Sequence, residues 1–196
     1  MRIIAGSHRG RPVTPPPDYR TTRPITDRVK EALFNRLHSL GLLGYGRVLD
    51  VYCGTGSMGL EALSRGAQHA LFVDRDPTAL KLLRQNIDGL GFTDRARVEP
   101  SDALAGMYLF AVPDGEVTVA FLDPPYADAD PQRESLAALL VKLAPKLEPG
   151  GVAVLRTPSE AEPPAVDALD LASVRYGGMT LHFFQSPLDE DEDATT

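Results

Sequence analysis

The sequence is poor in the residues that build metal centres and disulfide frameworks. Its 196 residues include one cysteine, no tryptophan and four histidines. A single cysteine excludes a disulfide framework, and no cysteine or histidine pair has the spacing of zinc ligands. No apolar run approaches the ~20 residues that a membrane helix needs, and the N-terminus lacks the apolar core of a signal peptide. We therefore expect a cytoplasmic protein that uses no metal and contacts no membrane.

Positive charge is scarce overall but concentrated near the N-terminus. The formal net charge is −7, yet residues 1–36 carry eight Lys or Arg against three Asp or Glu. This segment is therefore +5 and the rest of the chain −12. Such asymmetry is typical of an acidic catalytic domain with a basic arm that contacts nucleic-acid phosphates. Alternatively, the arginines only solvate an exposed segment. The residues expected to bind RNA are Arg9, Arg11, Arg23, Arg28 and Lys30.

The chain divides into a basic extension (1–25), an α/β domain (26–186) and an acidic tail (187–196) that we expect to be disordered. Within the domain, short apolar runs alternate with segments of helical periodicity. This alternation predicts a mostly parallel seven-stranded sheet with helices on both faces and a closing antiparallel hairpin. The expected strands are 47–52, 69–74, 95–99, 117–123, 152–156 and two within 171–185. The expected helices are 26–40, one that follows a glycine-rich turn and runs through Arg65, 77–90, 102–110 and 132–147.

A glycine-rich turn follows the first of these strands. Gly54 to Gly59 fits G-x-G-x-x-G, a pattern that lets the backbone turn tightly and lets a ligand approach the main chain. Asp74 stands 20 residues after Gly54, where an acid can accept hydrogen bonds from both hydroxyls of an adenosine ribose. NAD enzymes and S-adenosylmethionine enzymes share this pattern, and a tight turn without any ligand would also produce it.

Two further acids favour S-adenosylmethionine. Asp50 precedes the turn, where a carboxylate would be unfavourable beside a pyrophosphate but suits the ammonium of a methionine moiety. Asp102 follows the third expected strand and could accept from an adenine amino group, or equally could cap a helix. The residues expected to bind the cofactor are Asp50, Cys53, Gly54, Thr55, Gly56, Asp74, Arg75, Asp102 and Ala103.

Asp123, Pro124, Pro125 and Tyr126 directly follow the strongest expected strand and are the expected catalytic residues. Ligands bind at this end of the strands in such folds. A carboxylate and a backbone carbonyl oriented by the rigid prolines can accept hydrogen bonds from the two N–H groups of an exocyclic nucleobase amine. These hydrogen bonds strengthen as positive charge develops on the nitrogen. Tyr126 offers an aromatic face for the base. A proline turn that merely ends a strand would explain neither the acid nor the aromatic residue.

Cys53 is not the expected nucleophile. Cytosine-C5 methyltransferases use a cysteine beside a proline in the loop that corresponds to residues 123–126. Cys53 stands in the cofactor turn instead, where we expect it to fill a small apolar gap.

The sequence resembles the RsmD-type small-subunit rRNA guanine-N2 methyltransferases over about residues 1–185. The resemblance rests on residues 2–6 with 9–11, on 23–35, on 59–67 and on 123–126. It implies a Rossmann-like class I methyltransferase that transfers a methyl group from S-adenosylmethionine to the N2 amine of a guanine in 16S rRNA, within an assembled or assembling particle. Tyr52 and Cys53 replace the usual Phe-Ala, and Ile25 stands where Thr is common, which removes a side-chain hydrogen bond at that position.

Three other functions compete with this one. A DNA adenine-N6 methyltransferase shares residues 123–126 but normally carries a target-recognition domain, for which this chain has little room. A nicotinamide dehydrogenase would use the glycine turn and Asp74 yet leave the 123–126 segment and the basic arm without a role. A non-catalytic RNA-binding assembly factor would not need an intact Asp123 and Tyr126.

Overall fold

The computed structural model describes residues 1–15, 25–125 and 132–188. Three predictions lie outside these ranges: the RNA contact of Arg23, the catalytic role of Tyr126 and the disorder of residues 189–196.

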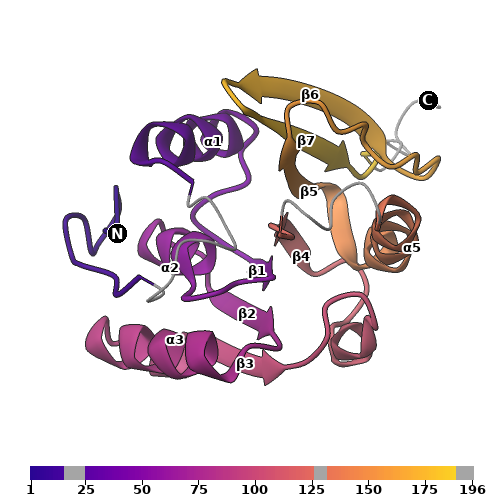
Figure 1. Ribbon diagram of the computed structural model, residues 1–196. Coiled ribbons are helices and arrows are strands. Elements are labelled where there is room, and N and C mark those ends of the chain that lie inside the picture. Colours follow the sequence, from indigo (N-terminus) through magenta and orange to yellow (C-terminus); the bar gives the residue numbers. More distant parts are fainter. Residues whose placement is uncertain (16–24, 126–131, 189–196) are drawn as a thin grey trace, which may run out of the picture.

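One sheet of seven strands forms the centre of the molecule, in the order β3-β2-β1-β4-β5-β7-β6 (Figure 1). The first five strands of the chain are mutually parallel, and β7 pairs antiparallel with both of its neighbours. This topology confirms the predicted α/β fold with its closing hairpin. The bounds are β1 Arg47–Val51, β2 His69–Asp74, β3 Ala96–Pro100, β4 Val117–Leu122, β5 Leu147–Pro158, β6 Asp170–Tyr176 and β7 Met179–Gln185.

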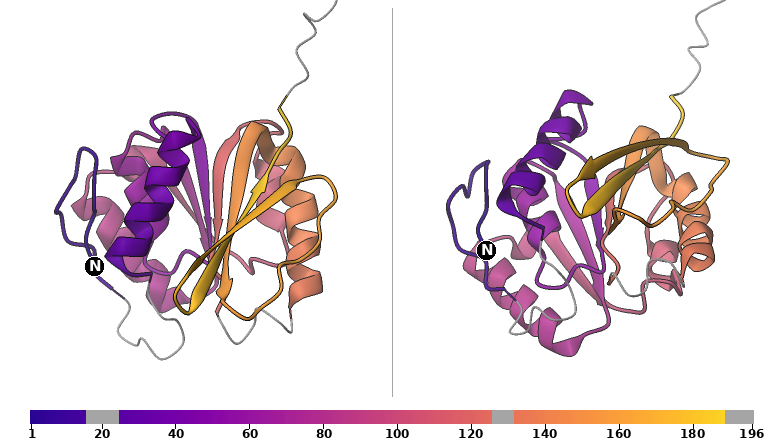
Figure 2. Two further views of the ribbon diagram at one scale, coloured as in Figure 1. Left: turned by 90° about the horizontal axis from the view of Figure 1, so that it is seen from above. Right: turned by 45° about the horizontal axis from the view of Figure 1, so that its top comes forward.

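Helices cover both faces of the sheet, and a separate apolar cluster fills the space on each side. Figure 2 shows α1, α2 and α3 on one face and α5 on the other. The bounds are α1 Asp27–Ser39, α2 Ser57–Ser64, α3 Pro77–Gly89 and α5 Arg133–Leu143, with short 3-10 helices η1 Thr93–Arg95, η2 Met107–Ala111 and η3 Ala144–Lys146. Thr26 caps α1 by accepting from the Val29 amide, as its position predicts.

Two of the predicted helices are wrong in extent. Only one 3-10 turn, η2, forms in the predicted helix 102–110. The predicted helix 132–147 ends at Leu143, because Pro145 has no amide hydrogen and restricts the residue before it. Strand β5 then begins at Leu147, so the predicted turn at 148–151 lies inside this strand, where its pairing with β4 shifts register.

The N-terminal segment (residues 1–15) packs against α2 through a buried carboxylate. Glu61 accepts hydrogen bonds from the backbone amides of Ile4 at 2.7 Å and Ala5 at 3.0 Å. The same carboxylate pairs with Arg65 at 2.8 Å and with Lys30 at 3.4 Å. Four donors therefore satisfy an acid that has no exposed surface. They join this segment to α1 and α2.

Gly6 is required at the closest approach of this segment to α2. Its φ of +84° is in the left-handed region, and a Cβ there would lie 1.9 Å from the carbonyl oxygen of Ser64. The same carbonyl accepts the Ser7 amide at 2.8 Å. Gly10 has a similar φ of +82°, but no described atom lies within 4 Å of the Cβ it would gain.

The two glycines provide a matched pair of variants. Both Gly6→Ala and Gly10→Ala force a side chain into left-handed backbone, which costs about 1 kcal/mol. Only Gly6→Ala also drives the segment away from α2, so we expect it to lower the free energy of unfolding by about 1–3 kcal/mol more than Gly10→Ala. Urea denaturation measures the difference, and equal losses would show that the segment does not dock on α2.

Candidate functional site

A cavity of about 350 Å³ opens where the carboxyl ends of β1, β2 and β4 meet. It brings together eight of the nine predicted cofactor residues and two of the predicted catalytic residues. These are Asp50, Cys53, Gly54, Thr55, Asp74, Arg75, Asp102, Ala103, Asp123 and Pro125. A second cavity, of about 380 Å³, lies beside β3 and η2 and contains none of them.

Gly56 and Pro124 lie outside the cavity lining. Gly56 precedes α2 with a φ of +87°, and a Cβ on it would lie 2.4 Å from Leu83 Cδ1. This glycine therefore permits the packing of the turn on α3, and its predicted direct contact with the cofactor has no support in the geometry. Pro124 is buried behind the cavity.

Asp50 is the most deeply buried acid of the cavity. Its Oδ2 accepts the Gly59 amide at 2.8 Å, which fixes the start of α2 against the end of β1. A Cβ on Gly59 would lie 2.4 Å from the Phe72 ring, so this contact needs a glycine. Burial, with Asp123 and Asp74 nearby, raises the pKa of Asp50 to about 8. The protonated form of this carboxyl is therefore favoured at neutral pH.

Asp74, at the end of β2, holds the glycine turn in place. Its Oδ2 accepts the Gly54 amide at 2.8 Å and its Oδ1 accepts the Asp76 amide at 2.9 Å. A carboxylate oxygen can accept a second hydrogen bond, so both oxygens retain capacity toward the cavity. This geometry suits the predicted acceptance of two ribose hydroxyls.

Asp102 lies across the cavity from the glycine turn. Its Oδ1 accepts the Leu104 amide at 2.9 Å, and its Oδ2 lies 3.3 Å from Arg75 Nη1. The alternative in which Asp102 caps a helix is wrong, because it caps a turn that does not continue as a helix. Both partners are at least half exposed, so this ion pair adds little to stability.

Cys53 belongs to the apolar cluster beneath the cavity. Burial raises the pKa of its thiol well above the ordinary value, so the group stays neutral. A neutral, buried thiol is a poor nucleophile, which agrees with the expectation that Cys53 fills an apolar gap.

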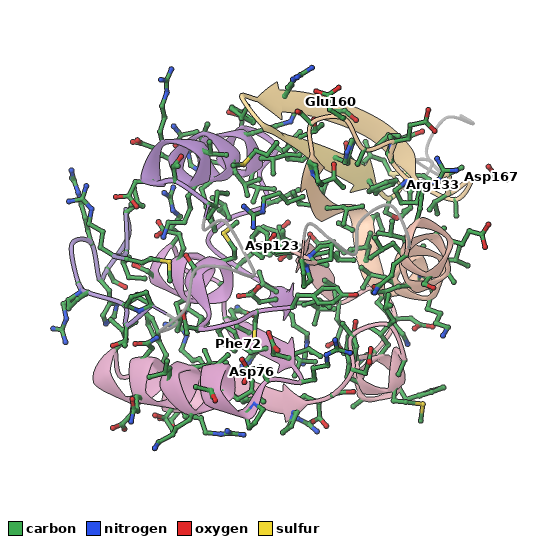
Figure 3. All side chains as sticks on the ribbon, in the orientation of Figure 1. Phe72, Asp76, Asp123, Arg133, Glu160 and Asp167 are labelled. Atoms are coloured by element: carbon green, nitrogen blue, oxygen red, sulfur yellow. The ribbon has the colours of Figure 1, made fainter. Side chains whose placement is uncertain are left out.

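Asp123 comes directly after β4 and lies near the middle of the molecule (Figure 3). Its amide donates to the Val51 carbonyl at 3.3 Å, and its Oδ1 accepts from Arg156 Nε at 2.5 Å. The side chain keeps 27% of its surface exposed, and it lines the cavity. Burial raises the pKa of Asp123 and the Arg156 guanidinium opposes that rise.

The structure adds cavity residues that sequence reasoning did not identify. Arg156 lies within an apolar strand, and only strand pairing brings it to Asp123. Met1 and Ile25 close one side of the cavity from the N-terminal part of the chain. The periodicity of α1 carries no information on such contacts. The additional lining residues are Met1, Ile25, Tyr52, Ser57, Met58, Asp76, Ala79, Ser101, Leu104, Gln132 and Arg156.

The predicted RNA contacts separate into exposed and buried residues. Arg9 and Arg28 are exposed, and Arg11 is exposed while it donates to the Gly89 carbonyl at 3.0 Å. Lys30 is a correction. It is 2% exposed, its Nζ donates to the Arg2 carbonyl at 2.9 Å and it pairs with Glu61, so it cannot reach a phosphate. Helical spacing places it one turn before Phe34, on the buried face, and this signal was available in the sequence.

Residues 1–185 match the family model described as "Conserved hypothetical protein 95". The chain belongs to this family. It is 37% identical to YlbH of Bacillus subtilis over 164 residues, which span 84% of this chain and 86% of that one. It is 38% identical over 126 residues to the "Ribosomal RNA small subunit methyltransferase D" of Escherichia coli, an alignment of 64% of this chain and 60% of that one.

Solved structures share the fold. That of yhhF from Escherichia coli superposes with a TM-score of 0.75 at 29% identity, covering 96% of this chain and 99% of that one. An RNA methyltransferase from Salinibacter ruber, complexed with S-adenosyl-L-homocysteine, has a TM-score of 0.58 at 22% identity and covers 87% and 97%. The predicted RsmD-type family and Rossmann-like class I fold are confirmed, and this methyltransferase family and fold confirm S-adenosylmethionine as the cofactor.

Within residues 1–15, 25–125 and 132–188, no helix is long and apolar enough to cross a membrane. The same residues contain no group of three or more His, Cys, Asp or Glu side chains placed to hold a metal ion. The expectation of metal-free chemistry stays a prediction.

Cofactor binding should release a proton from Asp50. The predicted pairing of Asp50 with the ammonium of the methionine moiety requires its carboxyl to ionise, and its pKa is about 8. Because the charged form is the one that binds, affinity should rise with pH between 6 and 8, by up to about tenfold per unit. Calorimetry at pH 7 in buffers of different ionisation enthalpy should find nearly one proton released. Asp50→Asn is the control and should release none; equal release by both proteins would remove Asp50 from the ammonium site.

Proposed function

We propose that this protein transfers a methyl group from S-adenosylmethionine to the exocyclic N2 amine of a guanine in small-subunit rRNA. The observation that carries the proposal is the position of Asp123, which opens into the same cavity as Asp50 and Asp74. An acceptor for an amine thus lies beside the acids proposed to hold a methionine and a ribose. The sulfonium methyl is already activated, so the remaining task of the site is to align the amine with it.

The reaction needs no further reagent. The lone pair of the amine nitrogen forms a bond to the methyl carbon, the carbon–sulfur bond breaks with its electron pair on sulfur, and a proton leaves the nitrogen for water. In our proposal Asp123 accepts a hydrogen bond from one N–H group of the amine. Pro124 and Pro125 orient a backbone carbonyl that accepts a hydrogen bond from the other N–H group. These contacts strengthen as the nitrogen becomes positive. Tyr126 would stack on the base.

The substrate rests on the family rather than on the cavity. The Escherichia coli relative is named for small-subunit rRNA, which supports rRNA as the substrate of this chain. The choice of guanine N2 and of 16S rRNA in an assembled or assembling particle rests on the RsmD resemblance. The cytoplasm as the site of action rests on the sequence features described first. Adenine N6 in DNA is the competing target, and a non-catalytic assembly role is the competing function. Methyl-transfer assays with small-subunit rRNA and with DNA distinguish these functions.

Substitution of Asp123 should damage turnover much more than cofactor binding. Because its contact with the amine tightens only in the transition state, Asp123→Asn should lower kcat at least tenfold, or about 1.4 kcal/mol. The Kd for S-adenosylmethionine should stay within about threefold, a change of under 1 kcal/mol. Transfer of labelled methyl to small ribosomal subunits from a strain lacking the modification measures kcat, and calorimetry measures the Kd.

Asp114→Asn is the matched control, since Asp114 is an exposed acid paired with Lys146 away from the cavity. It should retain full activity. If Asp123→Asn keeps turnover within threefold of the unchanged protein, the 123–126 segment is structural and the proposed chemistry fails.

The exposed arginines of the N-terminal segment should anchor rRNA phosphates. Replacing Arg9 and Arg11 together with Gln should weaken binding to the small subunit and flatten its salt dependence by about 0.7–0.9 in log–log slope for each lost contact. Cofactor affinity should not change, because neither residue lines the cavity. Arg133→Gln is the control, since Arg133 pairs with Glu162 on the surface. Normal binding by the double variant across a salt series would reduce the arginines to solvated surface.

A further inference from the structure

The pairing of β4 with β5 places an arginine against the proposed amine acceptor. Leu122 of β4 is in register with Leu155 of β5. The residues that follow them in the chain, Asp123 and Arg156, therefore lie side by side. Their side chains meet on the same face of the sheet, with Arg156 Nε 2.5 Å from Asp123 Oδ1. The arginine side chain is 4% exposed, and it also lines the cavity. A buried, charge-assisted contact of this kind fixes the orientation of the carboxylate.

Burial of the Asp123 carboxylate makes a neighbouring cation favourable there. Asp50 of β1 and Asp74 of β2 line the same cavity. Arg75 and Asp102 line the far part of the cavity and pair with each other. Arg156 from β5 is the cation that contacts Asp123 among the described residues. Without this cation, burial would favour a protonated Asp123 carboxyl.

We propose that Arg156 is a positioning residue for methyl transfer, which holds the Asp123 carboxylate ionised and turned so that its second oxygen faces the target amine. This inference rests on the proposed function. A protonated Asp123 has an O–H donor where the reaction needs an acceptor, and it cannot stabilise positive charge on the amine nitrogen. Arg156 acts only through Asp123, and it needs no contact with the base.

The first test is the pH profile of kcat at saturating S-adenosylmethionine, where Asp50 is already paired. Arg156→Gln should move the rising limb of the profile upward by at least one pH unit, because the loss of the cation raises the pKa of Asp123 further. Arg156→Lys keeps a positive charge, so its pH profile should lie close to that of the unchanged protein. Arg175→Gln is the matched control, since Arg175 pairs with Glu160 on the surface. The KM for the small subunit should change less than kcat in both Arg156 variants, and the control should change neither.

A second test needs no RNA substrate. Removal of Arg156 raises the folded-state pKa of Asp123, and the stability that accompanies a raised pKa is lost as pH rises through that value. The urea midpoint of Arg156→Gln should therefore fall increasingly below that of the unchanged protein from pH 5 to pH 8. When Asp123→Asn is added to the Arg156→Gln variant and to the unchanged protein, the difference between their urea midpoints should no longer depend on pH.

The two tests separate the inference from the proposed function. A chain that methylates no small-subunit rRNA overturns the proposed function, whatever the urea series shows. An active chain in which Arg156→Gln keeps the pH profile of the unchanged protein overturns the role of Arg156. A stability gap that is constant with pH, or that persists with Asn at position 123, overturns it as well.

Discussion

A carboxylate removed from water must find a donor or a cation, and this requirement organises the carboxyl edge of the sheet. Three acids at the ends of adjacent parallel strands meet it in different ways. Asp50 takes the Gly59 amide, Asp74 takes the Gly54 amide, and Asp123 takes the Arg156 guanidinium. Each contact fixes a carboxylate and also fixes a piece of backbone or a neighbouring strand. The hydrogen bonds that position these three acids therefore also shape the cavity.

The different partners give Asp50 and Asp123 different properties. Asp50 accepts from backbone amides, so burial dominates and its pKa rises to about 8. It becomes ionised when a cation arrives, which suits a ligand that carries an ammonium. Asp123 has a permanent cation, which opposes the effect of burial. It can thus remain an acceptor for a neutral amine, which brings no charge of its own. In the proposed function, one cavity thus combines an acid for a cationic cofactor with an acid for an uncharged target.

Local pattern predicted most of this architecture. The alternation of apolar runs with helical periodicity was enough for the sheet, because parallel strands need helical crossovers. Convergence of Asp50, Asp74 and Asp123 follows from the same topology, since the ends of parallel strands share one edge. The contact between Asp123 and Arg156 could not be predicted, because it depends on register between strands separated by α5. Net charge favours Lys30 as a phosphate contact, but its place on the buried face of α1 excludes that role. The predicted helix 132–147 ends early, at Leu143, because of Pro145.

The central claim is that this cavity methylates the N2 amine of a guanine in small-subunit rRNA. Its most direct test incubates the purified protein with S-adenosylmethionine carrying a deuterated methyl group and small ribosomal subunits that lack the modification. Mass spectrometry of the rRNA nucleosides should then find the label in N2-methylguanosine, at close to one methyl group per subunit. Label in another nucleoside, label only in added DNA as N6-methyladenine, or no label at all would contradict the account.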